Sequence, residues 1–184
     1  MIVAAVQAEL GPLPGHALGV GPLRAAVAMA RLIAEHNPQH VILIGSAGAY
    51  SADYPIGRAF VSGALGTQDG AAALGLAYTP LAPAPIATDP ALAARLALPS
   101  ARVLTVSAIS TDPALRARLA ADWDLEHMEA YGAALACQAA GVPFAAVLGV
   151  SNEVGPEAHA QWLQHRAAAE RAAQAVLQRI ASEA

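Results

Sequence analysis

The chain has 184 residues, of which 56% are hydrophobic and 13% charged, a balance that excludes a disordered protein and indicates one packed domain over residues 1–184. The formal net charge is -4 with only 10 lysines and arginines, which excludes electrostatic binding of nucleic acid or of an anionic membrane. Cys137 is the only cysteine and no apolar run reaches about 18 residues, so neither an intrachain disulfide nor a membrane span is expected. Glu9 interrupts the position where the apolar core of a signal peptide would continue, so we expect a cytoplasmic protein.

The first predicted strand is a short run of β-branched residues and alanines, Ile2 to Val6. It delivers Glu9 to its C-terminal end, where ligands of open α/β sheets bind. Glu9 is therefore a candidate site residue, with a solvated loop glutamate as the alternative interpretation. A second, brief strand is expected within His16 to Val20.

A glycine-flanked turn, Gly19-Val20-Gly21-Pro22, precedes a helix predicted from Leu23 to His36. Pro22 suits the first helical position, and Asn37-Pro38 ends the helical composition. Backbone N–H groups at the start of such a helix can bind an anion, so this turn is a second candidate, with an ordinary loop as the alternative.

A continuous apolar run, Val41 to Ile44, predicts a strand covered on both faces and followed by a turn from Gly45 to Tyr50. Small residues in that turn allow a ligand to approach the backbone, although an ordinary tight turn has the same composition. The next strand is predicted from Gly57 to Leu65. Glycines and prolines then predict loop from Gly66 to Pro99, with one short helix near Pro90 to Ala97.

Strands and helices alternate in the remaining sequence, which predicts an α/β fold with a single-domain, mostly parallel or mixed central sheet and helices on both faces. Cys137 lies among helical alanines and is predicted to be a small buried residue. His159, His165 and Arg166 are interpreted as surface groups of the last helix. The elements expected here are a strand from Arg102 to Ser107, a helix from Pro113 to Ala121 capped by Asp112, a helix from Ala130 to Ala140, a strand from Phe144 to Val150 and a helix from Pro156 to Ser182.

Polar and small residues stand at four of the predicted element ends. They are Glu9, the turn from Gly45, Met128-Glu129 and Ser151-Asn152. Because the carboxyl ends of parallel strands meet at one edge of a sheet, we expect these groups to form one site. No His, Cys and Asp cluster has metal-ligand spacing, and no P-loop or dinucleotide-binding motif is present. Neither a metal nor a cofactor is therefore expected.

The order of these groups resembles the nucleoside phosphorylase and nucleosidase superfamily. That family places a Glu after the first strand, G-x-G-P before a helix, G-S-A-G after a strand, M-E before a helix and S-D or S-N after the next strand. The matching residues here are Glu9, Gly19-Val20-Gly21-Pro22, Gly45-Ser46-Ala47-Gly48, Met128-Glu129 and Ser151-Asn152, in the same order. The segment between the first strand and the GVGP turn is shorter than in the family.

The resemblance implies a small-molecule nucleoside substrate and assembly as a homo-oligomer of two or more subunits. Glu9 and Asn152 are the implied catalytic residues, with Glu9 activating a water. Glu129 is the implied acceptor for the ribose hydroxyls, beside Met128 on the sugar face. The other implied substrate-binding residues are Ser46, Gly48 and Ser151.

Asn152 decides which purine is expected to leave. Family members that release adenine resemble one another in having Asp there, whereas Asn is typical of those acting on 6-oxopurines. With Trp162 as well, the sequence is most similar to the futalosine hydrolases, nucleosidases of menaquinone biosynthesis that release hypoxanthine. A cation such as Arg58, His159 or Arg166 is expected at the mouth of the site for the aromatic carboxylate of that substrate. The alternatives are a phosphorolytic purine nucleoside phosphorylase, in which Arg24 or Arg58 binds phosphate, a methylthioadenosine-type nucleosidase and a non-catalytic nucleoside-binding module.

Overall fold

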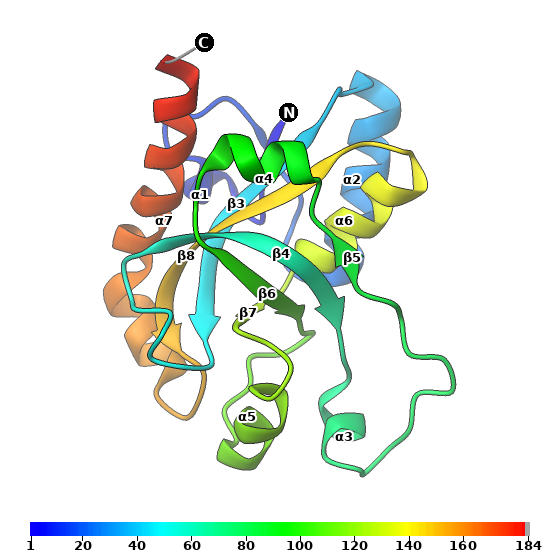
Figure 1. The fold of residues 1–184 in the computed structure, drawn as a ribbon, viewed down its shortest axis with the longest axis vertical. Helices are drawn as coiled ribbons and strands as arrows, with labels where there is room; N and C mark the ends of the chain where they lie inside the picture. The colour runs from blue at the N-terminus through cyan, green and yellow to red at the C-terminus, as the bar shows by residue number, and fades with distance from the viewer. Residues whose placement is uncertain (183–184) are drawn as a thin grey trace.

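The computed structural model describes residues 1–182, which form one eight-stranded sheet and seven helices (Figure 1). The strands are β1 (Ile2–Ala4), β2 (His16–Ala17), β3 (Val41–Ala49), β4 (Ala59–Thr67), β5 (Ile86–Ala87), β6 (Ser100–Thr105), β7 (Leu125–His127) and β8 (Phe144–Glu153). The helices are α1 (Gln7–Leu10), α2 (Pro22–His36), α3 (Gly70–Ala73), α4 (Pro90–Leu96), α5 (Pro113–Leu119), α6 (Ala130–Ala139) and α7 (Ala158–Ser182).

The sheet is mixed, which confirms the predicted fold class. Its strand order is β2-β1-β3-β7-β6-β4-β5, and β8 pairs with both β3 and β4. These pairings join β3, β7, β6, β4 and β8 into a closed ring. The pairs β1–β2, β1–β3, β3–β8, β4–β6 and β6–β7 are parallel, while β3–β7, β4–β5 and β4–β8 are antiparallel.

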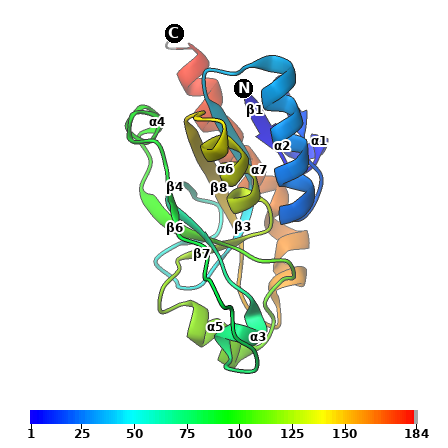
Figure 2. The same cartoon turned by 90° about the vertical axis from the view of Figure 1, so that its right-hand side faces the viewer.

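Helices α2 and α6 lie side by side on one face of the sheet (Figure 2). Ala25, Met29 and Leu32 recur at helical spacing along α2, and all three are buried. Helix α6 passes close to the start of α2, since a Cβ at Gly132 would overlap the carbonyl oxygen of Pro22. Cys137 of α6 is fully buried, as predicted, and burial raises the pKa of its thiol to about 12.

Helix α7 covers the opposite face, together with α4 and α1. Val176 and Leu177 are buried on its inner side, and burial of each such side chain contributes about 1.5 to 3 kcal/mol. The helix rests directly on β8 at one point, where a Cβ on Gly149 would overlap the backbone of Ala169. This close approach fixes where the first turns of α7 lie relative to the end of β8.

Three strands continue beyond their predicted ends, and β4 does so by two residues, to Thr67. The predicted turn from Gly45 to Tyr50 is wrong, because β3 extends to Ala49 with partners in β8 and, at Gly48 and Ala49, in β7. The predicted end of β8 at Val150 is also wrong, because backbone pairing with β3 continues to Glu153. The register shifts between Ala47 and Gly48, so one residue of β8 is bulged there.

Four short elements were not predicted. The loop predicted from Gly66 to Pro99 is interrupted by α3 and β5 in addition to the expected helix α4. Glu9 lies on the single-turn helix α1 rather than in a loop. Strand β7 has three residues, too few to show a hydrophobic period in the sequence. The predicted cap of α5 is confirmed, because a carboxylate oxygen of Asp112 accepts a hydrogen bond from the N–H of Leu115 at 2.8 Å.

Candidate active site

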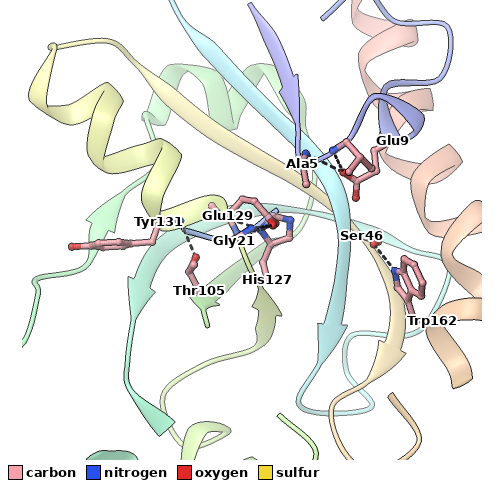
Figure 3. A network of polar contacts seen from close by, with 11 residues as sticks. Ala5, Glu9, Gly21, Ser46, Thr105, His127, Glu129, Tyr131 and Trp162 are labelled. Carbon is pink, nitrogen blue, oxygen red and sulfur yellow. Dashed lines mark hydrogen bonds and ion pairs between the residues drawn. The ribbon is translucent and has the colours of Figure 1, made fainter. Parts of the chain in front are cut away.

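A cavity of about 440 Å³ opens where the ends of β1, β3, β7 and β8 meet α1 and α7. Its volume falls within the range of small-molecule sites. Every site residue predicted from the sequence lines this cavity: Glu9, Ser46, Gly48, Met128, Glu129, Ser151 and Asn152. Figure 3 shows part of the polar network that these residues make, including the contacts of Glu9, Ser46 and Glu129.

The carboxylate of Glu9 is held by the backbone that precedes it. Its Oε2 accepts hydrogen bonds from the N–H groups of Ala5 at 3.0 Å and Val6 at 3.2 Å (Figure 3). Burial raises the pKa of Glu9 to about 7, aided by the negative charges of Glu129 and Glu170 and opposed by the backbone hydrogen bonds. Near neutral pH this carboxyl group therefore exists in both protonation states, as a general base requires.

Glu129 stands at the N-terminus of α6 and is 4% exposed. Its Oε1 accepts a hydrogen bond of 2.8 Å from the N–H of Gly21, a residue 108 positions earlier in the chain (Figure 3). The N–H of Gly21 in the GVGP turn therefore binds the carboxylate of Glu129. Backbone N–H groups at the start of a helix favour an anion of this kind. Each carboxylate oxygen has two acceptor positions, so Glu129 retains acceptor capacity toward the cavity.

His127 is a cavity residue that the sequence did not single out. Its Nδ1 accepts hydrogen bonds from the N–H groups of Glu129 and Ala130, each at 3.1 Å. Nδ1 also lies 3.4 Å from Oε2 of Glu129, an ion-pair distance. A proton on Nδ1 would point at two N–H donors, and burial lowers the pKa of His127 more than Glu129 raises it. The ring is therefore neutral, with its proton on Nε2.

Glu9 and His127 approach one another over Gly45. A Cβ at Gly45 would lie 3.2 Å from Nε2 of His127 and 3.3 Å from Oε1 of Glu9. Because Gly45 has no side chain, Nε2 of His127 and Oε1 of Glu9 can both approach it closely. In the sequence, His127 is recognisable only as the residue before Met128-Glu129.

Asn152 has a fixed orientation at the bulge of β8. Its Nδ2 donates to the carbonyl of Glu153 at 3.0 Å, and its Oδ1 accepts from the hydroxyl of Ser151 at 2.8 Å. Exchanging the oxygen and nitrogen of the carboxamide would set Oδ1 against the carbonyl oxygen of Glu153. One N–H of Nδ2 is left for a ligand. Ser151 also lies 3.2 Å from the carbonyl oxygen of Ala47.

A third buried carboxylate, Glu126, lines the cavity together with Ile109. Oε2 of Glu126 accepts from the hydroxyl of Tyr50 at 2.7 Å, and Oε1 accepts from the N–H of Ser110 at 2.9 Å. Burial and the charge of Glu126 raise the pKa of Tyr50, so this hydroxyl stays protonated as a donor. The side chain of Ile109, next to Ser110 in the chain, adds an apolar surface to the cavity.

The first turns of α7 form the mouth of the cavity. Trp162 donates from Nε1 to the hydroxyl of Ser46 at 3.2 Å (Figure 3). The guanidinium of Arg166 lies 4.8 Å from the centre of the Trp162 ring, and the His159 ring stacks on it at 5.8 Å. His159 and Arg166 are exposed, as predicted, and both also line the cavity, as two of the three cations expected at its mouth. Neither Arg24 nor Arg58 lines it.

Within residues 1–182 there is no group of three or more His, Cys, Asp or Glu side chains suited to a metal ion. Among the same residues, no helix combines the length and hydropathy of a membrane span.

The fold and the cavity define an α/β protein with a small-molecule site at its strand ends. The sequence pattern of the Phosphorylase superfamily matches residues 12–182, and the chain belongs to that family. No sequence among the curated proteins matches the chain.

Solved structures of nucleosidases have the same fold. The native futalosine hydrolase of Helicobacter pylori strain 26695 superposes with a TM-score of 0.88 at 17% identity, over 100% of this chain and 97% of that one. The methylthioadenosine/S-adenosylhomocysteine nucleosidase of Colwellia psychrerythraea 34H, bound to adenine, gives 0.85 at 20% identity over 97% and 92%. The S-adenosylhomocysteine nucleosidase of Streptococcus pyogenes gives 0.83 at 22% identity over 99% and 95%.

Proposed function

We propose that this protein hydrolyses the N-glycosidic bond of a 6-oxopurine nucleoside, with futalosine as the substrate and hypoxanthine as the released base. The observation that carries the proposal is the convergence of Glu9, Glu129 and Asn152 on one cavity. These three groups suit the nucleophile, the sugar and the base of such a reaction. The proposal includes a single-domain, cytoplasmic homo-oligomer.

Glu129 binds the sugar in this proposal. N-glycosidic cleavage passes through a ribose that resembles an oxocarbenium ion, which a nearby carboxylate stabilises. The vicinal hydroxyls of ribose match the two oxygens of a carboxylate, and Gly21 already orients that of Glu129. Met128 packs its thioether on the sugar face.

Glu9 activates the attacking water. Ala5 and Val6 hold Oε2, so Oε1 is the oxygen available to accept a proton from water. In the step, water gives a proton to Glu9 and its oxygen bonds to the anomeric carbon. The electron pair of the C–N bond passes to the purine, which then takes up a proton. A pKa of about 7 for Glu9 suits this transfer at neutral pH.

Asn152 stabilises the departing base. The free N–H of Nδ2 donates to N7 or O6 of a 6-oxopurine as negative charge builds there. The carbonyl of Glu153 favours a carboxamide at this position, because its oxygen faces Nδ2 at 3.0 Å. A carboxylate there would place two acceptors against each other.

Arg166 and Trp162 suit the 5′ side of futalosine, which carries an aromatic carboxylate. The indole offers an apolar surface, and the guanidinium beside it offers a charge at the mouth of the cavity. Of the three cations expected from sequence, Arg166 and His159 line the cavity and Arg58 does not.

The test is chromatography of the products from futalosine, inosine and methylthioadenosine, each with and without inorganic phosphate. We expect hypoxanthine from futalosine at a rate independent of phosphate. Strict phosphate dependence would identify a phosphorylase, and adenine as the main product would identify a methylthioadenosine-type nucleosidase. A bound nucleoside that survives incubation intact would identify a binding module.

A further inference from the structure

His127 has no part in the roles assigned above, yet it is a buried imidazole that lines the cavity. Its Nδ1 is occupied by two backbone donors at the start of α6. Nε2 is the only nitrogen left to face a ligand, and it carries the proton. The side chain is therefore a hydrogen-bond donor and not a base.

Gly45 sets this donor beside Glu9. Nε2 of His127 and Oε1 of Glu9 lie 3.2 and 3.3 Å from the position that a Cβ of Gly45 would occupy. Because Gly45 has no side chain, both groups approach its backbone from the cavity, and both are anchored by backbone hydrogen bonds on their far sides. A water lying between them would have an acceptor for one of its protons and a donor for one of its lone pairs.

We propose that His127 positions the nucleophilic water by donating from Nε2–H to its oxygen while Oε1 of Glu9 accepts its proton. This inference rests on the proposed hydrolysis, and it assigns His127 to the positioning of the nucleophilic water. The donor orients the remaining lone pair of the water toward the anomeric carbon. Proton transfer goes only to Glu9, because Nε2 is already protonated.

Other charged groups near Glu9 also affect its pKa. Glu129 at the start of α6 and Glu170 on α7 raise the pKa of Glu9, and Arg166 lies beside Glu170. The Nε2–H of His127 favours the ionised form of Glu9 through the shared water. Removing that donor is therefore expected to raise the pKa of Glu9. If His127 acted only as the acceptor for the N–H groups at the start of α6, its removal would not produce that change.

Two substitutions separate the two nitrogens of the ring. His127→Asn places an amide oxygen near the position of Nδ1, so it retains the acceptor at the start of α6 and loses the distal donor. His127→Gln places an amide nitrogen near Nε2, so it retains the donor and loses the acceptor. We expect His127→Asn to melt close to the wild type but to lose kcat by about 100-fold, with KM for the nucleoside little changed. His127→Gln is expected to melt lower and to retain kcat within about tenfold.

The acidic limb of the pH profile is the second measurement. We expect it to move to higher pH in His127→Asn and to stay in place in His127→Gln. The proposal is overturned if His127→Asn keeps the wild-type kcat, or if activity in both variants follows only the folded fraction.

A third measurement keeps this inference distinct from the proposed function. Nitrogen NMR of His127 is expected to show a neutral ring protonated at Nε2, and the pH dependence of unfolding is expected to report the raised pKa of Glu9 in His127→Asn. If the wild type releases no base from any nucleoside, the hydrolase proposal fails, and these two readings still decide the pairing. A proton on Nδ1, or an unshifted Glu9, overturns it.

Discussion

Gly48 of β3 and Asn152 of β8 are register partners, and the carboxamide of Asn152 occupies the space that a side chain at Gly48 would fill. A Cβ at Gly48 would lie 2.8 Å from Nδ2 of Asn152 and 3.0 Å from a methyl group of Val154. The absence of a side chain on β3 therefore sets the position of the group that we assign to the base.

Gly48→Ala is expected to displace Asn152 and break its hydrogen bond to Glu153. Overpacking of this kind costs about 1 to 3 kcal/mol of unfolding free energy, and we expect kcat/KM for inosine to fall about tenfold. Gly70→Ala on α3 is the matched control, since its Cβ would meet only the flexible side chain of Leu115 at 3.3 Å. Wild-type kinetics in Gly48→Ala would contradict the assignment of Asn152.

Asn152→Asp is expected to reduce the preference for 6-oxopurines. The new carboxylate oxygen would face the carbonyl of Glu153, so it would either take a proton or turn away. We expect the ratio of kcat/KM for inosine to kcat/KM for methylthioadenosine to fall at least tenfold, equivalent to about 1.4 kcal/mol. Asn37→Asp at the end of α2 adds the same charge elsewhere and serves as the control. An unchanged ratio would show that our account of base recognition is wrong.

Glu129→Gln is expected to cost about 2 to 4 kcal/mol of transition-state stabilisation, measured as the fall in kcat/KM. The amide oxygen of glutamine still accepts the N–H of Gly21, so the melting temperature should stay near that of the wild type. The loss should be smaller for 2′-deoxyinosine, which lacks one of the hydroxyls assigned to this carboxylate. A loss of stability with unaltered kinetics would instead make Glu129 a purely structural group.

Titration of Glu9 should make activity and stability depend on pH in opposite directions. Activity should rise through the pKa of about 7, because the ionised form is the base. Stability should behave the other way: the pKa of Glu9 is raised on folding, so the native state binds the proton more tightly than the unfolded state. The stability that this proton confers is complete below the unfolded pKa of about 4.3 and is lost as pH rises to about 7.

Glu9→Gln separates these two effects. It should abolish most of the activity and remove the loss of stability between about pH 4.3 and 7, making the variant more stable than the wild type at pH 8 by up to roughly 3 kcal/mol. Denaturant unfolding at pH 5 and pH 8 measures the difference. Equal pH dependence in both proteins would mean that Glu9 titrates normally.

Arg166→Gln is expected to lower kcat/KM for futalosine by three- to tenfold, equivalent to about 1 kcal/mol for a charge pair near solvent. Inosine has no 5′ carboxylate and should be hydrolysed at nearly the wild-type rate. Arg58→Gln removes the same charge outside the cavity and provides the control. A parallel loss on both substrates would assign Arg166 to stability or to the ribose rather than to the 5′ group.

Residues that carry a local signal could be predicted from the sequence. Asp112 followed by Pro113 is an unambiguous helix start, and the apolar run after Gly141 produces a buried strand wherever the sheet lies. The seven predicted cavity residues belong to short motifs whose order resembles that of the family. These residues lie at the ends of strands. The strand order implied by the family resemblance brings those ends together at one cavity.

The remaining features depend on partners that are distant in the chain. β7 is held by β3 and β6, and its own three residues contain no period. The position of His127 follows from the N-terminus of α6 and from Gly45, and no neighbouring residue in the sequence indicates either contact. Arg166 is one of three cations expected at the mouth of the site, and the packing of α7 on β8 is what places it at the cavity while Arg58 lies outside.

The contact of Gly149 with Ala169 has a consequence for how this protein can diverge. Because α7 rests on β8 without an intervening side chain, the helix cannot slide along the strand, and a bulkier residue at 149 would be selected against. Positions 159 and 166 can then be exchanged without breaking any hydrogen bond given above for Glu9 or Asn152. Under the proposed function, a lineage with this fold can acquire a new 5′ specificity through the outer helix alone while inheriting its reaction unaltered.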